Sequence, residues 1–247
     1  MSGHSKWSTI KRQKGAADAK RGAAFTKLGN AIAIAVREGG GGDPESNFRL
    51  RLAVEKAREA NMPKENIQRS IDRGLGKIGE ASLEAAVYEG FGPGGASIIV
   101  ETITDNSTRT ANELRGVFSK NGGSLGTPGS VAYLFSKVGE IEIAGGGGVT
   151  FERVFERAVE AGAQDAQEKD GIFWVYTKPT ELHQIKAALE TAGIGAAEAA
   201  VVYRPNRETM VEVGEEDGQR LGKLLGAVDE LDDVQEVYVN AEFIEAT

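Results

Sequence analysis

The 247-residue sequence contains no cysteine and only two histidines, His4 and His183. Disulfides, thiolate metal sites and cysteine nucleophiles are therefore excluded, and a zinc site is disfavoured because the histidines are far apart in the chain. No run of about 18 apolar residues is present, and the first residues lack the apolar core of a secretory signal. We therefore expect no membrane span and a cytoplasmic location.

Sequence motifs that carry catalysis are also missing. Segment 218–223 has one residue too few between its glycines for a phosphate-binding P-loop, and Leu224 stands where Ser or Thr would bind magnesium. Glycines at 92–95 could form an anion-binding nest, but a strand pattern follows them, which favours a simple turn. The acidic cluster at 229–236 lacks the spacing and the central glycine of a calcium loop. We expect no enzyme activity, no cofactor and no bound metal.

Charge is distributed unevenly along a chain whose formal net charge is −8. Residues 1–77 hold 16 Lys and Arg against 8 Asp and Glu, whereas residues 78–247 hold 13 against 29. A basic surface attracts polyanions and an acidic one repels them, so the sequence favours a nucleic acid as partner, either DNA or RNA. The alternative interpretation is a solvated helix surface or a solubilising basic arm.

Apolar spacing in the basic part predicts three short helices. Residues 5–22 are polar, basic and small, which is typical of a mobile or partly helical arm. From Phe25 apolar residues recur at three- and four-residue steps up to the glycines at 39–42. A second helix is predicted after Pro44 and a third from Pro63 to Gly74.

Past residue 80 the pattern changes to strands and helices. Two apolar runs flank the turn at 92–95 and predict a hairpin, and a helix over 108–120 follows, with Ser107 or Thr108 as its cap. Residues 130–135 read as a further strand. Residues 138–203 give the order β-α-β-β-α-β of a ferredoxin-like sandwich. Strand, helix and strand patterns between 209 and 239 would complete the unit begun near residue 80.

The sequence therefore predicts an α+β protein with an N-terminal helical bundle followed by two ferredoxin-like α/β domains, one inserted in the other. Three separate units in series are the competing arrangement. The expected divisions are a basic arm at 1–24, a three-helix bundle at 25–78, a discontinuous α/β domain at 79–136 plus 206–247, and an inserted domain at 137–205.

Short motifs along the whole chain carry a family resemblance. They are, in chain order, Met1–Trp7, Asp18–Gly22, Phe25–Leu28, Asn61–Glu65, Tyr88–Gly95, Thr104–Asn106, Phe118–Gly123, Gly129–Ala132 and Asp233–Tyr238. Together they closely resemble the YebC/PmpR family, which includes the mitochondrial translational activator of cytochrome oxidase subunit one. The resemblance implies a three-domain cytoplasmic protein without a cofactor. It also implies one of two roles, a DNA-binding transcriptional regulator or a ribosome-associated factor that helps translation through proline-rich stretches.

The resemblance and the charge pattern together point to the basic arm as the nucleic-acid contact. Trp7 within it can stack on a base or anchor the arm on the bundle. The third helix, with Gln68, Arg69 and Arg73, is a weak candidate for a recognition helix. The candidate contacts are His4, Ser5, Lys6, Trp7, Lys11, Arg12, Lys14, Lys20, Arg21 and Lys27.

We therefore predict a non-enzymatic nucleic-acid-binding regulator of gene expression, a DNA-binding transcriptional regulator of the YebC/PmpR type. The alternative is a ribosome-associated translation factor that binds ribosomal RNA. The expected partner is DNA or ribosomal RNA, with no membrane and no small-molecule substrate.

Overall fold

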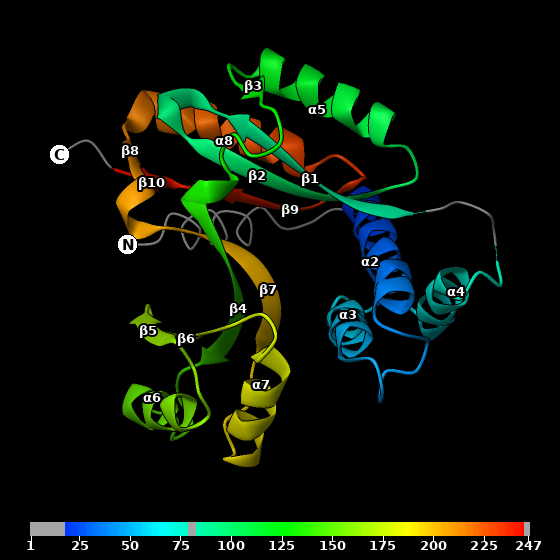
Figure 1. Cartoon of the computed structure of the whole chain (residues 1–247), viewed down its shortest axis with the longest axis vertical. Helices are drawn as coiled ribbons and strands as arrows, with labels where there is room; N and C mark the ends of the chain where they lie inside the picture. The colour runs from blue at the N-terminus through cyan, green and yellow to red at the C-terminus, as the bar shows by residue number, and fades with distance from the viewer. Residues whose placement is uncertain (1–17, 79–82, 245–247) are drawn as a thin grey trace. The chain divides into compact units, whose positions relative to one another are not determined.

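The computed structural model describes residues 18–78 and 83–244, which fall into two compact units (Figure 1). Unit 1 comprises Met1–Ser136 and Pro205–Thr247, and unit 2 comprises Lys137–Arg204. Three helices come first in the described chain, and mainly antiparallel sheets with further helices follow, which confirms the predicted α+β class. The finer division of unit 1 into arm, bundle and α/β domain stays a prediction.

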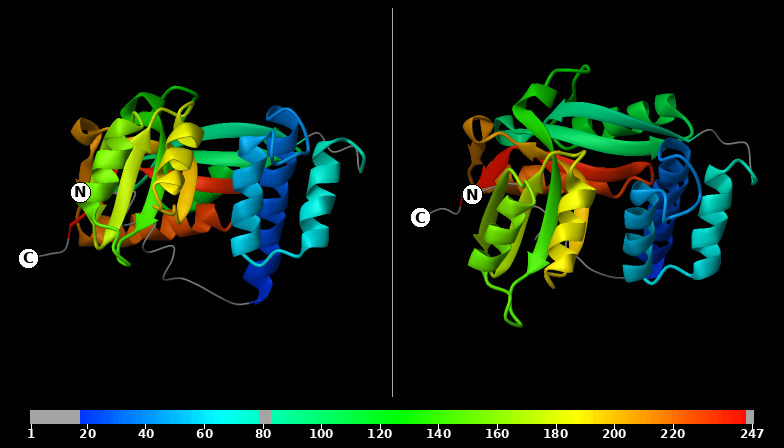
Figure 2. Two further views of the ribbon diagram at one scale, coloured as in Figure 1. Left: turned by 90° about the horizontal axis from the view of Figure 1, so that it is seen from below. Right: turned by 60° about the horizontal axis from the view of Figure 1, so that its bottom comes forward.

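Unit 1 begins with a bundle of three helices, α2 (Asp18–Glu38), α3 (Phe48–Glu59) and α4 (Lys64–Gly74). The three helices lie next to one another with their axes roughly parallel or antiparallel (Figure 2). The apolar stripes predicted from the sequence meet in one core, which contains Ile32, Ala35, Val36, Leu50, Val54, Ala57, Met62, Ile67 and Ile71. Because α2 begins at Asp18, the last residues of the predicted arm are helical.

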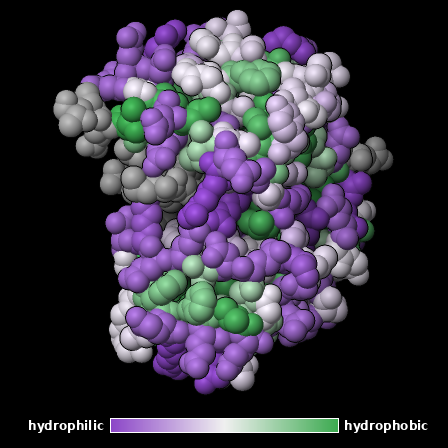
Figure 3. All heavy atoms as spheres, turned by 60° about the vertical axis from the view of Figure 1, so that its left-hand side comes forward, coloured by the Kyte–Doolittle hydropathy of each residue, from purple (hydrophilic) through white to green (hydrophobic). Residues whose placement is uncertain are grey.

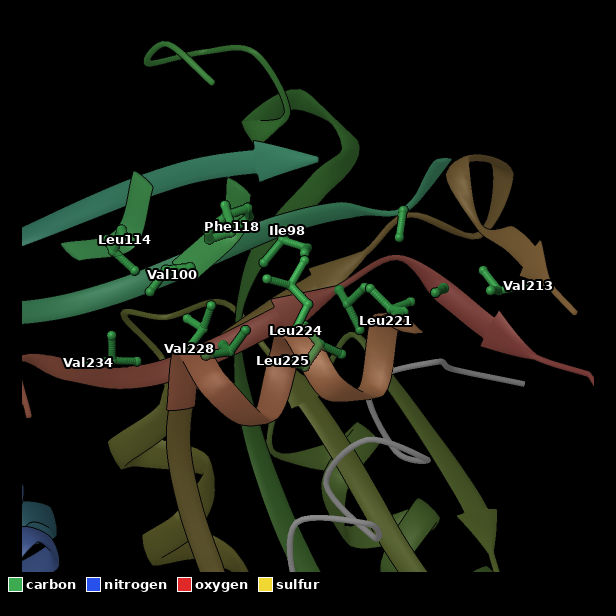
Figure 4. Close-up of a cluster of buried hydrophobic side chains, with 14 residues drawn as sticks. Ile98, Val100, Leu114, Phe118, Val213, Leu221, Leu224, Leu225, Val228 and Val234 are labelled. Carbon is green, nitrogen blue, oxygen red and sulfur yellow. The ribbon is translucent and has the colours of Figure 1, made fainter. Parts of the chain in front are cut away.

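The glycine turn at 92–95 joins β1 (Glu84–Phe91) to β2 (Ser97–Thr104) as the predicted antiparallel hairpin. These strands form a sheet in the order β3-β1-β2-β9, with β3 at Ser124–Leu125 and β9 at Val234–Val239. Helices α5 (Ser107–Lys120) and α8 (Glu215–Asp229) cover one face of this sheet (Figure 4). The buried residues between them and the sheet include Ile98, Val100, Leu114, Phe118, Leu221, Leu224, Leu225, Val228 and Val234.

The predicted cap of α5 is wrong. The side chain of Asn106, not of Ser107 or Thr108, accepts the backbone N–H of Arg109 at 3.0 Å. The backbone angles of Asn106 are not helical, as is usual for a capping residue, whereas Ser107 is already the first residue of the helix.

Two features at the end of the chain also differ from the sequence prediction. Helix α8 begins at Glu215, four residues before the expected start at 219. Strand β10 (Ala241–Phe243) was not predicted, and it pairs in parallel with β8 (Val211–Val213) in a separate two-stranded sheet. A three-residue strand carries too little periodicity to be recognised from the sequence.

The prediction of a strand over 130–135 is also wrong, because backbone N–H groups in and next to this segment donate hydrogen bonds to one buried carboxylate. Glu89 accepts the N–H groups of Gly129 at 2.6 Å, Val131 at 2.6 Å and Ala132 at 2.8 Å. These donors are no longer available to a strand ladder. The segment forms a loop and a 3-10 turn, η2 (Ala132–Leu134), and the next strand starts at Phe135.

Unit 2 has the ferredoxin-like topology predicted from the sequence. Its elements are β4 (Phe135–Ala144), α6 (Phe151–Glu160), β5 (Asp165–Lys169), β6 (Ile172–Thr177), α7 (Leu182–Thr191) and β7 (Glu198–Pro205). The strands lie in the order β5-β6-β4-β7, and β6 is antiparallel to both β4 and β5. Among the described helices, none combines the length and the apolar character needed to cross a membrane.

Glu89 gives the first testable prediction. Burial alone would raise the pKa of its carboxyl group, but hydrogen bonds from the N–H groups of Val131, Gly129 and Ala132 outweigh burial and lower the pKa. The carboxylate therefore stabilises the fold above its unfolded-state pKa of about 4.3, and this stabilisation is lost as the pH falls through the lower folded-state pKa. We expect Glu89→Gln to lower the free energy of unfolding at neutral pH by about 1–3 kcal/mol, measured by denaturant titration.

The deficit of Glu89→Gln should shrink in acid, where the wild-type carboxylate is itself protonated. Glu84→Gln, an exposed change on the same strand, is the matched control and should leave stability near the wild-type value. Equal stability of Glu89→Gln and wild type at neutral pH would show that the carboxylate does not hold the loop.

Candidate nucleic-acid interface

Most of the predicted contact residues lie outside the described residues. These are His4, Ser5, Lys6, Trp7, Lys11, Arg12 and Lys14. Positions 20 and 21 fall in the first turn of α2, and Lys27 lies about two turns further along the same helix. The structure thus places three of the ten predicted residues, all on α2.

Lys27 already has an intramolecular role. Its ammonium group donates to the backbone carbonyl of Asp229 at 2.5 Å, and Asp229 is the last residue of α8. The last turn of α8 contains no basic residue of its own, so Lys27 supplies the positive charge that the carbonyl end of this helix favours. Lys27 therefore links the bundle to the α/β part of unit 1.

Several other basic side chains of the bundle are also engaged within unit 1. Arg37 donates to the carbonyl of Leu83 at 2.5 Å, across the segment that joins the bundle to the sheet. Further pairs are Arg49 with Glu38, Lys56 with Glu236 at 3.3 Å, Lys77 with Asp72 at 3.3 Å, and Arg51 with the carbonyls of Pro44 and Glu45 at 3.1 and 3.0 Å. A basic residue in the sequence is therefore not always a cation available to a ligand.

Arg58, Lys64 and Arg69 differ from these residues. All three are exposed, and within the described residues their side chains form no hydrogen bond or ion pair. Arg58 lies in the last turn of α3, Lys64 is the first residue of α4, and Arg69 follows on α4. We refer to this set as the α3–α4 cations. Of the three, only Arg69 was predicted from the sequence as a candidate nucleic-acid contact.

The turn between α3 and α4 fixes the backbone that carries these cations. Asn61 adopts a left-handed conformation with φ of 59°, and Met62 is buried in the bundle core. Pro63 precedes α4 without any side-chain cap, so the first N–H groups of α4 point toward solvent at the positive end of the helix dipole. Of the three cations, Lys64 therefore lies at the positive end of the α4 dipole, whereas Arg58 lies at the carbonyl end of α3.

Arg73 does not belong to this surface, although it was predicted as part of a recognition helix. Its guanidinium donates to the side chain of Asn30 at 2.6 Å and is half-buried between α4 and α2. Burial lowers the pKa of Arg73, and the negative charge of Asp105 partly offsets this effect.

Helices α2 and α4 pack closely next to Arg73, and this packing requires glycine at position 74. A Cβ atom there would lie 2.6 Å from the carbonyl oxygen of Ala33 on α2.

The polar motif at 104–110 forms a closed cluster around Asp233. The carboxylate of Asp233 accepts from the hydroxyl of Thr110 at 2.6 Å, from Arg109 at 2.9 Å and from the hydroxyl of Thr104 at 3.1 Å. Burial would raise the pKa of Asp233, but these hydrogen bonds outweigh it and lower the pKa. The cluster ties β9 to the start of α5, which explains why this loop is polar.

Two carboxylates of the acidic segment at 229–236, which the sequence analysis did not favour as a cation site, pair with basic side chains: Asp233 binds Arg109 and Glu236 pairs with Lys56. Within residues 18–78 and 83–244, no group of three or more carboxylate or histidine side chains is arranged to hold a metal ion. A groove of about 400 Å³ between α6 and α7 is lined by Arg153, Arg157, Glu160, Thr191 and alanines. It offers no nucleophile paired with a base, and Arg153 is held by the carbonyl of Ala192 at 2.7 Å.

Two family models match the chain and together span nearly all of it. The model for the TACO1/YebC protein N-terminal domain matches residues 5–77, and the model for the TACO1/YebC second and third domain matches residues 83–241. The first match contains the arm and the α3–α4 cations, and the second contains the acidic part of the chain. The family resemblance stated from the sequence motifs is thus confirmed.

Similar proteins agree with this assignment. A protein of Paraburkholderia xenovorans named a probable transcriptional regulatory protein is 51% identical over 99% of this chain and 100% of its own length. A protein of the same name from Rubrobacter xylanophilus is 51% identical over 99% of this chain and 97% of its own length. The crystal structure of a conserved hypothetical protein from Aquifex aeolicus matches with a TM-score of 0.83 and 43% identity over 93% of each chain.

The different environments of Lys27 and Lys64 lead to opposite expectations. We expect Lys27→Gln to lower the free energy of unfolding by about 1–2 kcal/mol, because a charge-assisted hydrogen bond to Asp229 is lost. The matched variant Lys64→Gln should change it by no more than about 0.5 kcal/mol, because that side chain is exposed. Chemical denaturation of both variants measures this, and equal stabilities would contradict the linking role of Lys27.

Proposed function

Because the chain belongs to the TACO1/YebC family, we propose that it is a non-enzymatic, nucleic-acid-binding regulator of gene expression that binds DNA and controls transcription. Relatives of the same length and about half-identical sequence carry the name of probable transcriptional regulatory proteins. The name supports the regulatory role, and the charge distribution of this chain supports the mode of binding.

The observation that carries the proposal is the location of uncompensated positive charge. Residues 1–77 contain twice as many basic as acidic residues, while the remainder is strongly acidic. In the bundle, the α3–α4 cations stay unpaired within the described residues when most of their neighbours are engaged. A polyanion is therefore attracted to the bundle and repelled by the rest of the chain.

Binding of this kind depends mainly on phosphate contacts. Lysine and arginine side chains neutralise phosphates and release counterions, which gives affinity without reading sequence. The predicted arm residues, among them Lys6, Trp7 and Arg12, would add further phosphate and stacking contacts. Sequence preference requires contacts to base edges or a preference for DNA shape.

A ribosomal target is the second candidate, and one observation favours it. The three helices of the bundle lie roughly side by side (Figure 2), whereas a helix-turn-helix places its recognition helix at about 90–120° to the preceding one. Arg69 and Lys64 therefore lie on an up-and-down bundle, which suits the recognition of phosphate and shape. Double-stranded RNA, which makes up much of the ribosome, is recognised mostly by its shape and by contacts to phosphates and 2′-hydroxyls.

Salt dependence of binding tests the role of the α3–α4 cations. We expect the triple variant Arg58→Gln, Lys64→Gln and Arg69→Gln to weaken binding to a DNA duplex and to reduce the slope of log K against log salt by about 2–3, since each lost phosphate contact contributes about 0.9. Fluorescence anisotropy across a salt series measures both quantities.

The matched control is a triple variant in the acidic part, Lys120→Gln, Lys178→Gln and Lys223→Gln, whose side chains are also exposed. It has the same change in net charge and should keep the wild-type slope. If the control and the α3–α4 variant lose the same amount of affinity, net charge and not a defined surface determines binding.

Location in the cell separates the two candidates. A transcriptional regulator should stay out of ribosomal fractions in a sucrose gradient of lysate at moderate salt, and its footprint on a promoter should persist above about 150 mM salt. Co-sedimentation of the wild-type protein with ribosomes, together with its loss in the double variant Lys20→Glu and Arg21→Glu, would contradict the transcriptional role. It would show that the protein regulates translation instead. Unchanged binding of that double variant to both targets would remove α2 from the interface.

A further inference from the structure

The exposed flank of helix α6 is the most unusual surface of unit 2. Phe155 and Val159 are 46% and 53% exposed, and they are the only large apolar side chains so exposed in unit 2, all of whose residues the structure describes. Figure 3 brings forward the side on which α6 lies in Figure 1 and shows apolar side chains gathered between hydrophilic ones in its lower part. Such a patch on a small domain commonly marks an interaction surface.

This flank of α6 faces the free edge of the sheet. At about 100° per residue, positions 155 and 159 lie opposite positions 153 and 157 on the helix. Arg153 binds the carbonyl of Ala192 next to α7, so the opposite flank faces away from α7. Helix α6 packs on β5 and β6, and β5 is the edge strand of the sheet. Phe155 and Val159 therefore lie beside the β5 edge.

The sequence of β5 is complementary to itself when two copies run antiparallel. The strand reads Asp165, Ala166, Gln167, Glu168 and Lys169. Pairing about a two-fold axis at Gln167 places Asp165 of each copy opposite Lys169 of the other. Within one copy the carboxylate of Asp165 also accepts from Gln167 at 3.0 Å and pairs with Arg204 at 3.5 Å, so the intermolecular pair would add to these contacts. A shift of the register by one or two residues loses both opposite-charge pairs. Opposite charges directly across a strand pair stabilise it, and like charges destabilise it.

The two faces of β5 match this arrangement. Ala166 and Glu168 pair with Val175 and Phe173, and the ring of Phe173 contacts Phe151 of α6, so these positions face the helix layer. Asp165, Gln167 and Lys169 alternate with them and face the other side of the sheet. The charged pairs and the apolar flank thus occupy opposite faces of one edge.

The spacing of the helices also fits. Strands in a continuous sheet are about 4.8 Å apart, so two α6 helices that each pack between β5 and β6 would have axes about 10 Å apart across the two-fold axis. Packed helices have axes about 8–10 Å apart. Phe155 and Val159 of the two copies would fill the space between the helices.

We propose that the β5 edge and the Phe155–Val159 flank of α6 form a self-association surface, which pairs with the same surface of a second copy of this chain about a two-fold axis at Gln167. Charges on a short edge strand commonly prevent pairing. Here, however, the two ends of one face carry opposite signs, which antiparallel self-pairing brings together. Within unit 2, no exposed large apolar side chain lies outside α6, so the helix beside the other edge strand, β7, carries none.

A single engineered cysteine tests this pairing directly, because the chain contains none. In an antiparallel pair, residues opposite each other have Cα atoms about 4.5–5.5 Å apart, which is within the range of about 4.4–6.8 Å that a disulfide spans. Gln167→Cys should therefore form a covalent dimer under mild oxidation of the full-length protein. The control Gln184→Cys, on the exposed surface of α7, should cross-link at least about tenfold more slowly, because its pairing needs random collision.

Charge reversal tests the register. Adding Lys169→Asp to Gln167→Cys should slow cross-linking about tenfold, because both ion pairs become repulsive. Adding Asp165→Lys as well should restore it, while Lys178→Asp, the same charge change elsewhere on unit 2, should have no effect. Circular dichroism of each variant shows whether unit 2 stays folded.

Sedimentation velocity of the unmodified chain from about 1 to about 100 μM completes the test, a range that covers weak interfaces. Reversible dimers that Phe155→Ser removes would support the surface. Cross-linking of Gln167→Cys no faster than of Gln184→Cys, or cross-linking insensitive to Lys169→Asp, would overturn the proposal.

Discussion

The separation of charge along the chain is the constraint on which the proposed function depends. The first 77 residues are basic and the following 170 are acidic, although the whole chain carries a formal net charge of −8. A polyanion near this protein experiences attraction at the bundle and repulsion elsewhere, so the charge pattern orients the ligand before any close contact forms.

Within the basic part, the fold itself decides which cations remain available. The ammonium group of Lys27 donates to the backbone carbonyl of Asp229, and the guanidinium group of Arg37 donates to that of Leu83. These hydrogen bonds join the bundle to the rest of unit 1. Cations at the α3–α4 turn have no such partner within the described residues. Among the described side chains, the bundle thus uses Lys27 and Arg37 for internal contacts, while Arg58, Lys64 and Arg69 on α3 and α4 stay exposed.

Regular elements with long apolar stripes could be predicted from the sequence, and elements that depend on distant polar contacts could not. The second predicted helix, after Pro44, corresponds to α3, and the predicted β-α-β-β-α-β order corresponds to unit 2. The strand expected over 130–135 does not form because Glu89, some 40 residues earlier, accepts the N–H groups of Val131 and Ala132. No local pattern reveals such a partner. For the same reason the sequence showed that the first segment is basic but not which of its side chains stay unpaired.

Protection of lysines from acetylation on nucleic-acid binding tests the central claim most directly, because it reports contact residue by residue in the intact chain. The account predicts that lysines within residues 1–77, including Lys64, lose reactivity when DNA or RNA is added, while Lys120, Lys178 and Lys223 keep theirs. Protection confined to residues 78–247, with the lysines of residues 1–77 unchanged, would contradict it.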